Sequence, residues 1–126
     1  MDTLANMLIA IKNAGLVKKT SIVIPSSKMK VSILELLKNE GYIKTYHVQD
    51  GTKKTIEVVL EYKGNEARIH DVKRVSKPSK RMYTGVKDIS PVKYGHGMLV
   101  LSTPKGIMTD KQARKEMVGG ELLFTI

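Results

Sequence analysis

The chain has 126 residues, and its 22 lysines and arginines against 12 acidic residues give a net charge of +10. It contains no cysteine, which excludes disulfides, thiol catalysis and thiolate metal sites and favours a reducing cytoplasm. No apolar run approaches the ~20 residues that a membrane-spanning helix needs, and no secretory leader is visible. The positive charge favours a polyanionic partner, and we expect nucleic acid rather than a membrane because no long basic amphipathic helix is present.

The chain opens with a predicted amphipathic helix. Apolar residues recur at helical spacing over residues 4–11, and Asp2 or Thr3 can cap the start. Gly15 is expected to end this helix. The short apolar run at residues 21–24 then predicts a strand.

A second helix and a hairpin are expected next. Ser26 and Ser27 offer an N-cap, and the helix should continue to about Glu40. Its expected buried residues are Val31, Leu34 and Leu37, with Ile33 beside them. Two β-type runs follow, at residues 42–49 and 54–62, and the Asp-Gly pair between them is typical of a hairpin turn.

The rest of the chain predicts mostly short strands. These are expected at residues 67–75, 81–86, 98–101 and 121–126, with a helix at 109–117 and a short helical turn at 91–94. The succession of predicted strands is interrupted at residues 63–66. We therefore expect an α+β protein with an N-terminal α-β-α-β-β half, residues 1–63, packed on a β-rich C-terminal half with one short helix, residues 64–126.

A hydroxyl-rich turn near the C-terminus is the first candidate site. Ser102 and Thr103 can donate to phosphate oxygens and accept from a ribose 2′-hydroxyl, and Lys105 adds a point charge. Gly106 permits a backbone angle that other residues resist. We expect a strand-to-helix turn here, with the Gly-Gly pair before Glu121 forming a second tight turn beside it. Serine and threonine are also ordinary turn and capping residues, but the net charge favours binding.

A basic segment is the second candidate site. It comprises Lys73, Arg74, Lys77, Lys80 and Arg81, and Tyr83 follows it. Strand alternation would place Arg81 and Tyr83 on one face, where a cation and a ring could meet the same stretch of backbone. Runs of charged residues usually form solvent-exposed surface, so the alternative interpretation is an exposed loop with no role in binding.

Enzyme functions find little support in the sequence. The histidines at 47, 70 and 96 lack the paired spacings of metal sites. Asp110 and Glu116 would lie on different faces of their helix, and Glu121 suits a structural or hydrogen-bonding role better than that of a general base. Lys105-Gly106 lacks the upstream glycine of a P-loop. We therefore predict no catalytic residue, no metal and no cofactor.

Several motifs together resemble a known family. Residues 101–114, which read LSTPKGIMTDKQAR, and the Gly-Gly-Glu that ends at Glu121 are similar to bacterial small-subunit ribosomal protein eight. The RVSKP stretch at residues 74–78, with Arg81 and Tyr83, and the opening residues 2–14 also resemble it. The likeness covers the whole chain, in the family's order.

This resemblance implies a non-catalytic, cytoplasmic protein of the small ribosomal subunit that binds a helix in the central domain of the 16S ribosomal RNA and helps platform assembly. It places Ser102, Thr103, Lys105 and Gly106 in the RNA minor groove, with Glu121 as a polar contact or brace. It also implies that Tyr83, Arg81, Lys80 and Lys77 approach the same RNA. The family often has serine at the position of Pro104. The proline of this chain would stiffen the loop.

The resemblance further implies contacts with neighbouring small-subunit proteins, and the free protein is expected to be a monomer. Members of the family can also repress translation of their own operon by binding its messenger RNA. Two alternatives come from the residues alone. A duplex DNA-binding regulator would suit the charge, but no helix-turn-helix pair is evident. A protein-interaction adaptor would need no polyanion at all.

Overall fold

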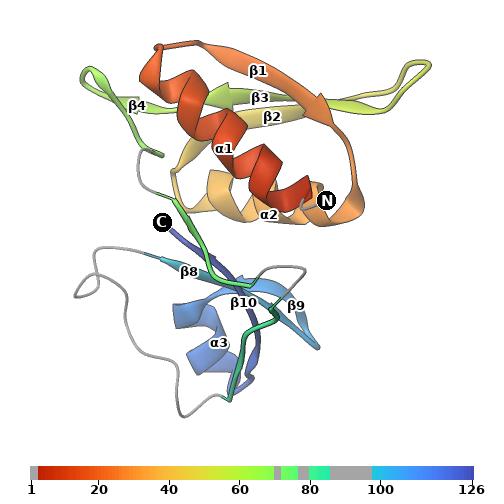
Figure 1. The fold of residues 1–126 in the computed structure, drawn as a ribbon, viewed down its shortest axis with the longest axis vertical. Coiled ribbons are helices and arrows are strands. Elements are labelled where there is room, and N and C mark those ends of the chain that lie inside the picture. Colours follow the sequence, from red (N-terminus) through yellow and green to blue (C-terminus); the bar gives the residue numbers. More distant parts are fainter. Residues whose placement is uncertain (1–2, 70–71, 77–79, 86–97) are drawn as a thin grey trace. The chain divides into compact units, whose positions relative to one another are not determined.

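A computed structural model describes residues 3–69, 72–76, 80–85 and 98–126 (Figure 1). The chain divides into two compact units, Thr3–Asp71 and Val72–Ile126. Each unit combines helices with antiparallel strands, which confirms the α+β class. The division lies later than the predicted interruption at residues 63–66, because that interruption is a turn between two short paired strands of the first unit.

The first unit is a three-stranded antiparallel sheet with two helices on one face (Figure 1). Its elements are α1 (Thr3–Leu16), β1 (Ser21–Pro25), α2 (Lys28–Asn39), β2 (Ile43–Gln49), β3 (Thr55–Leu60), β4 (Tyr62–Lys63) and β5 (Glu66–Ala67). The strand order is β1-β3-β2, so β3 is central. Ile56, Val58 and Leu60 of β3 alternate as buried residues and give the sheet its apolar face.

The predicted end of α1 at Gly15 is wrong. The helix continues to Leu16, and the left-handed backbone of Lys18, with φ of 58°, reverses the chain just beyond it. A Cβ atom on Gly15 would lie 2.6 Å from the Cβ of Ala67. Gly15 is therefore a packing position, at which the missing side chain lets β5 approach the helix.

We expect Gly15→Ala to destabilise the protein by about 1 to 3 kcal/mol, as overpacking a rigid contact does. Helix propensity alone predicts the opposite sign, because alanine is favoured over glycine by about 1 kcal/mol inside a helix. Urea unfolding would measure the difference. The double variant Gly15→Ala/Ala67→Gly should recover most of the loss, and a stabilised Gly15→Ala single variant would contradict this packing.

Helix α2 confirms the predicted cap and corrects the predicted buried face. The Ser27 hydroxyl accepts from the Lys30 backbone N–H at 3.2 Å, and the helix ends at Asn39 with Glu40 as its C-cap, before Gly41 with φ of 79°. Its buried residues are Lys30, Ile33, Leu34, Leu36 and Leu37. Val31 is only half-buried, because the residue pairs 33/34 and 36/37 face the sheet.

The second unit is a sheet built around a central C-terminal strand. Its elements are β6 (Lys73–Arg74), β7 (Tyr83–Thr84), β8 (Leu99–Thr103), β9 (Gly106–Thr109), α3 (Asp110–Glu116) and β10 (Gly120–Thr125). β10 pairs with β8 along one edge and with both β6 and β7 along the other, and β8 also pairs with β9. The predicted single strand at 67–75 is wrong: β5 pairs with β4 in the first unit, whereas β6 pairs with β10 in the second.

Helix α3 covers one face of this sheet. Thr109 caps it in a capping box with Gln112, which confirms the predicted start. Ala113 is fully buried and packs against Leu99, Leu101 and Met108, with Val118 and Leu122 at the margin of this cluster. The predicted helical turn at 91–94 and the end of the predicted strand at 81–86 lie outside the described residues.

Candidate nucleic-acid interface

The hydroxyl-rich segment is the turn of a β-hairpin, so the predicted strand-to-helix turn is wrong. In the register of β8 and β9, Val100 is paired with Thr109 at one end and Thr103 with Gly106 at the other. Only Pro104 and Lys105 lie between the two strands. Gly106 has φ of +119°, a conformation that favours glycine and lets the chain enter β9 directly after the turn. The helix follows only after this additional strand.

The strand register decides which side chains face away from α3. Leu101 is paired with Leu122 and Met108, and all three belong to the cluster against Ala113. Ser102 is the next residue along β8, so its side chain points to the opposite face. This face is the one that α3 does not cover.

A row of side chains crosses that uncovered face. Glu121 is the register partner of Tyr83 on β7 and of Ser102 on β8, and Ser102 is the partner of Ile107 on β9. We call Tyr83, Glu121, Ser102 and Ile107 the outer row. Tyr83 is 69% exposed and the other three are half-buried. The structure thus brings Tyr83, Glu121 and Ser102 together although the sequence separates them widely.

Glu121 also binds a predicted basic residue. The Arg81 Nη1 donates to Glu121 Oε2 at 2.9 Å, and the arginine side chain is 52% exposed while the glutamate side chain is 16% exposed. The carboxylate therefore holds the guanidinium beside the outer row and leaves much of it accessible. Lys80, the preceding residue, is exposed.

Ser102 and Thr103 do not share a face, and their hydroxyls are in different situations. The Thr103 side chain is buried, where its hydroxyl accepts from the Lys105 backbone N–H at 3.2 Å and donates to the Gly106 C=O at 2.8 Å. Within the described part of the chain, no group is bonded to the Ser102 hydroxyl. Thr103 thus braces the turn, and Ser102 can offer its hydroxyl to a ligand.

Lys105 lies at the tip of the turn and forms an ion pair with α3. Its Nζ is 3.4 Å from Glu116 Oε2, and both side chains are about half exposed, at 57% and 49%. Exposed pairs of this kind contribute little to stability, so the ammonium can exchange the carboxylate for a phosphate at small cost.

Two glycines let β10 pass between β7 and β8. A Cβ atom on Gly120 would lie 2.1 Å from the Ser102 carbonyl oxygen, and one on Gly119 would lie 2.2 Å from the Thr84 carbonyl oxygen. Real Cβ atoms do not approach a backbone oxygen so closely. The Gly-Gly pair is therefore what allows Glu121 to be in register with both Ser102 and Tyr83.

Ser76, which lies within the basic segment, holds the backbone next to Arg81 in place. Its hydroxyl accepts from the Met82 N–H at 2.8 Å and donates to the Met82 C=O at 3.1 Å, and the residue is fully buried. The Leu122 N–H donates to the same Met82 C=O at 2.8 Å. These bonds fix the backbone beside Arg81 next to β10. No local sequence pattern indicates this role, because the burial of the Ser76 hydroxyl is seen only in the structure.

The other basic residues of this segment lie elsewhere. Lys73 and Arg74 pair with Thr125 and Phe124 at the opposite end of β10 from Glu121, and the Arg74 guanidinium donates to the Leu123 C=O. Arg74 thus has a structural bond. Lys77 lies outside the described residues.

Neither a metal site nor a membrane-spanning helix is found in the described ranges. No group of three or more His, Cys, Asp or Glu side chains there could hold a metal ion. Asp110 is buried beside the Leu99 N–H and the Arg114 guanidinium, which is a structural role. None of the described helices is long and apolar enough to cross a membrane.

Comparison with known proteins identifies the family. The family model described as Ribosomal protein S8 matches residues 2–126. This chain belongs to the ribosomal protein S8 family. Small ribosomal subunit protein uS8 of Mycoplasmopsis agalactiae is 49% identical over 99% of this chain and 96% of its own length, and that of Mycoplasmopsis pulmonis is 50% identical over the same shares. The uS8 protein of a Bradyrhizobium species is 45% identical, again over 99% and 96%.

Family membership confirms the resemblance that the motifs indicated. An S8-family chain is a structural constituent of the small ribosomal subunit, located in the cytoplasmic ribosome, and is not an enzyme. The residues of the outer row and the basic segment therefore have to be understood as parts of a ribosomal protein.

Proposed function

We propose that this S8-family protein binds small-subunit ribosomal RNA through the outer row, with Arg81, Lys80 and Lys105 around it. The observation that carries the proposal is the register of Tyr83, Glu121 and Ser102 on the face that α3 leaves uncovered. This face offers the Tyr83 ring and the Ser102 hydroxyl on strands that flank β10, with the half-exposed Arg81 guanidinium bound to Glu121 beside them. The resemblance extends the proposal to a helix of the 16S central domain, to platform assembly and to the operon messenger.

Each side chain would make a different contact. The Ser102 hydroxyl can donate to a base or phosphate acceptor and accept from a ribose 2′-hydroxyl, which distinguishes RNA from DNA. The Tyr83 ring can stack on a base or a sugar, and the cations neutralise phosphates. Glu121 carries negative charge itself, so its contribution is to orient Arg81 rather than to attract the backbone.

Thr103 and Gly106 take part indirectly in this mechanism. The Thr103 hydroxyl and the positive φ of Gly106 shape the turn that ends β8, and this turn presents Lys105. Pro104 fixes its own φ and limits the freedom of the turn before binding. For Thr103 and Gly106 we therefore propose a supporting role: they shape the turn from which Ser102 and Lys105 contact the RNA.

Replacing Ser102 with alanine is expected to weaken specific RNA binding by about 1 to 3 kcal/mol, because polar groups of the RNA lose their partner in a desolvated contact. Filter binding with a 16S central-domain fragment would measure the loss. Ser32→Ala, at an exposed position of α2, is the matched control and should leave both affinity and stability unchanged. If the Ser102→Ala and Ser32→Ala variants bind the RNA fragment with equal affinity, the outer row is not the RNA-binding surface.

The same assay tests the electrostatic part of the proposal. If about five phosphates are neutralised, log affinity should fall with log salt at a slope of roughly −4. Duplex DNA of equal length should compete poorly. Competition as strong as that of the RNA would favour the alternative of a DNA-binding regulator, and an affinity independent of salt would favour a protein adaptor.

A further inference from the structure

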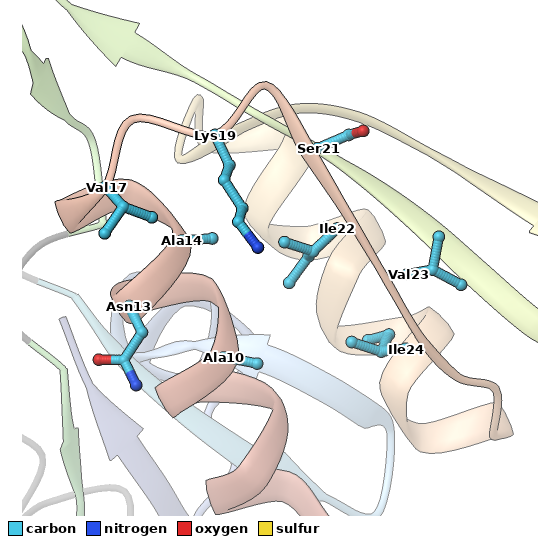
Figure 2. A pocket seen from close by; sticks show the side chains of 9 residues that line it. All are labelled: Ala10, Asn13, Ala14, Val17, Lys19, Ser21, Ile22, Val23 and Ile24. Carbon is cyan, nitrogen blue, oxygen red and sulfur yellow. The ribbon is translucent and has the colours of Figure 1, made fainter.

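The first unit contains a groove that the proposed RNA contacts do not use. It has a volume of about 600 Å³ and lies between α1 and β1 (Figure 2). Its walls are mostly apolar, with Ala10 and Ala14 from the helix and Val17 just beyond its end facing Ile22 and Ile24 from the strand. Val17 is 67% exposed and Val23, on the rim, is 58% exposed. Apolar groove walls with exposed apolar residues at their margin form a contiguous patch, and such patches are typical of contact surfaces for other proteins.

The strand along this groove has a free edge. Among the described strands, β1 pairs only with β3. Two hydrogen bonds mark the ends of that pairing: the Thr20 C=O accepts from the Leu60 N–H at 3.0 Å, and the Ser26 N–H donates to the Lys54 C=O at 3.1 Å. Hydrogen-bonded positions alternate in an antiparallel pair. The backbone groups of Ser21 and Val23 consequently point away from β3 and can accept another strand.

One cation reaches into the groove. The Lys19 side chain extends from the loop between α1 and β1 into the space between Ala14 and Ile22 (Figure 2). Its backbone is held on both sides, because its N–H donates to the Ala14 C=O at 2.9 Å and its C=O accepts from the Tyr62 hydroxyl. Within the described ranges no acid pairs with the Lys19 ammonium, and no acidic residue lines the groove.

We propose that this groove docks an extended, acidic segment of another protein of the small subunit. The segment would add a strand to the outer edge of β1 through Ser21 and Val23, place an apolar side chain against Ala14 and Val17, and pair a carboxylate with Lys19. Main-chain bonds to the strand edge provide affinity in such complexes, and side-chain pockets provide specificity. The complementary charge selects the partner and speeds its association.

Two other occupants suit the groove less well. RNA would need several cations along its path, whereas the groove offers one ammonium between apolar walls. A second copy of this chain would bring together two molecules that each carry a net charge of +10. Both nevertheless give distinct results in the test below.

Photocrosslinking inside purified small subunits tests the proposal. A Val17→p-benzoylphenylalanine reporter leaves the edge of β1 intact and lies on the rim of the groove. We expect it to crosslink to one neighbouring protein, at a segment that contains an acidic residue. The same reporter at Val48, which is 46% exposed on the opposite edge strand β2, is the matched control and should not reach that segment.

Two further variants establish the contacts. With the Val17 reporter in place, Lys19→Glu should reduce the crosslink yield about tenfold, equivalent to ~1.4 kcal/mol, whereas Lys19→Arg should preserve it. Val23→Pro, which removes an outward N–H from an edge strand, should also reduce the yield. Yields are normalised to the amount of the chain in the subunits. A defect in RNA binding, which lowers that amount, is therefore distinguished from loss of docking.

Four results would overturn the proposal. These are a crosslink to RNA alone, a crosslink to a second copy of the chain, no crosslink at all, and a yield unaffected by Lys19→Glu. The first of them would instead assign the groove to the ribosomal RNA, and the fourth would remove the charge pairing on which the choice of an acidic partner depends.

Discussion

Gly120→Ala is expected to lower the free energy of unfolding by about 3 kcal/mol, at the upper end of what overpacking usually costs. The added Cβ would lie 2.1 Å from the Ser102 carbonyl oxygen and 2.9 Å from its carbonyl carbon. Both are backbone atoms, so no side-chain rotation can relieve the clash, and β10 has to move away from β8. Thermal unfolding should show a melting temperature lower by about 10 °C.

The same displacement should reduce RNA affinity. Moving β10 separates Glu121 from Ser102 and disturbs the outer row, so we expect a loss at least as large as that of Ser102→Ala. Gly85→Ala is the matched control, because nothing lies within 4 Å of a Cβ built at Gly85 and its φ is not positive. If Gly120→Ala and Gly85→Ala unfold at the same temperature, β10 does not approach β8 as closely as the structure has it.

The elements of the first unit could largely be predicted from local signals. Ser27 caps α2 and the Asp-Gly turn joins β2 to β3, as their residue types indicate. The prediction for Gly15 was wrong because a glycine near a helix end usually terminates the helix. Here it is required by Ala67, a contact between residues far apart in sequence, which no local pattern reveals.

In the second unit, the sequence indicated candidate residue types but not how they are arranged. Ser102 and Thr103 are adjacent and chemically alike, yet strand alternation sends one to the uncovered face and the other into the turn. Recognising this requires β9, whose Gly106–Thr109 segment is too short to show a period of its own. The pairing of Glu121 with both Tyr83 and Ser102 likewise depends on the order of strands in the sheet.

Ser76→Ala is expected to reduce both stability and RNA affinity, and for separable reasons. Ser76 is fully buried, and loss of its hydroxyl removes the partner of the Met82 N–H from a part-buried hydrogen bond, which should cost about 1 to 3 kcal/mol of unfolding free energy. The Met82 backbone, directly after Arg81, also loses its attachment to Ser76. Because an arginine must then be ordered at the moment of binding, RNA affinity should fall about tenfold, or ~1.4 kcal/mol.

Val58→Ala distinguishes positioning from general destabilisation. Val58 is fully buried in β3 of the first unit, so its truncation should lower stability by a comparable amount while leaving RNA affinity nearly unchanged. A double-mutant cycle then tests the route. If Ser76 acts by holding Arg81 in place, Ser76→Ala should cost little further affinity in an Arg81→Ala background. Fully additive losses would show that Ser76 supports the fold without positioning the arginine that Glu121 orients.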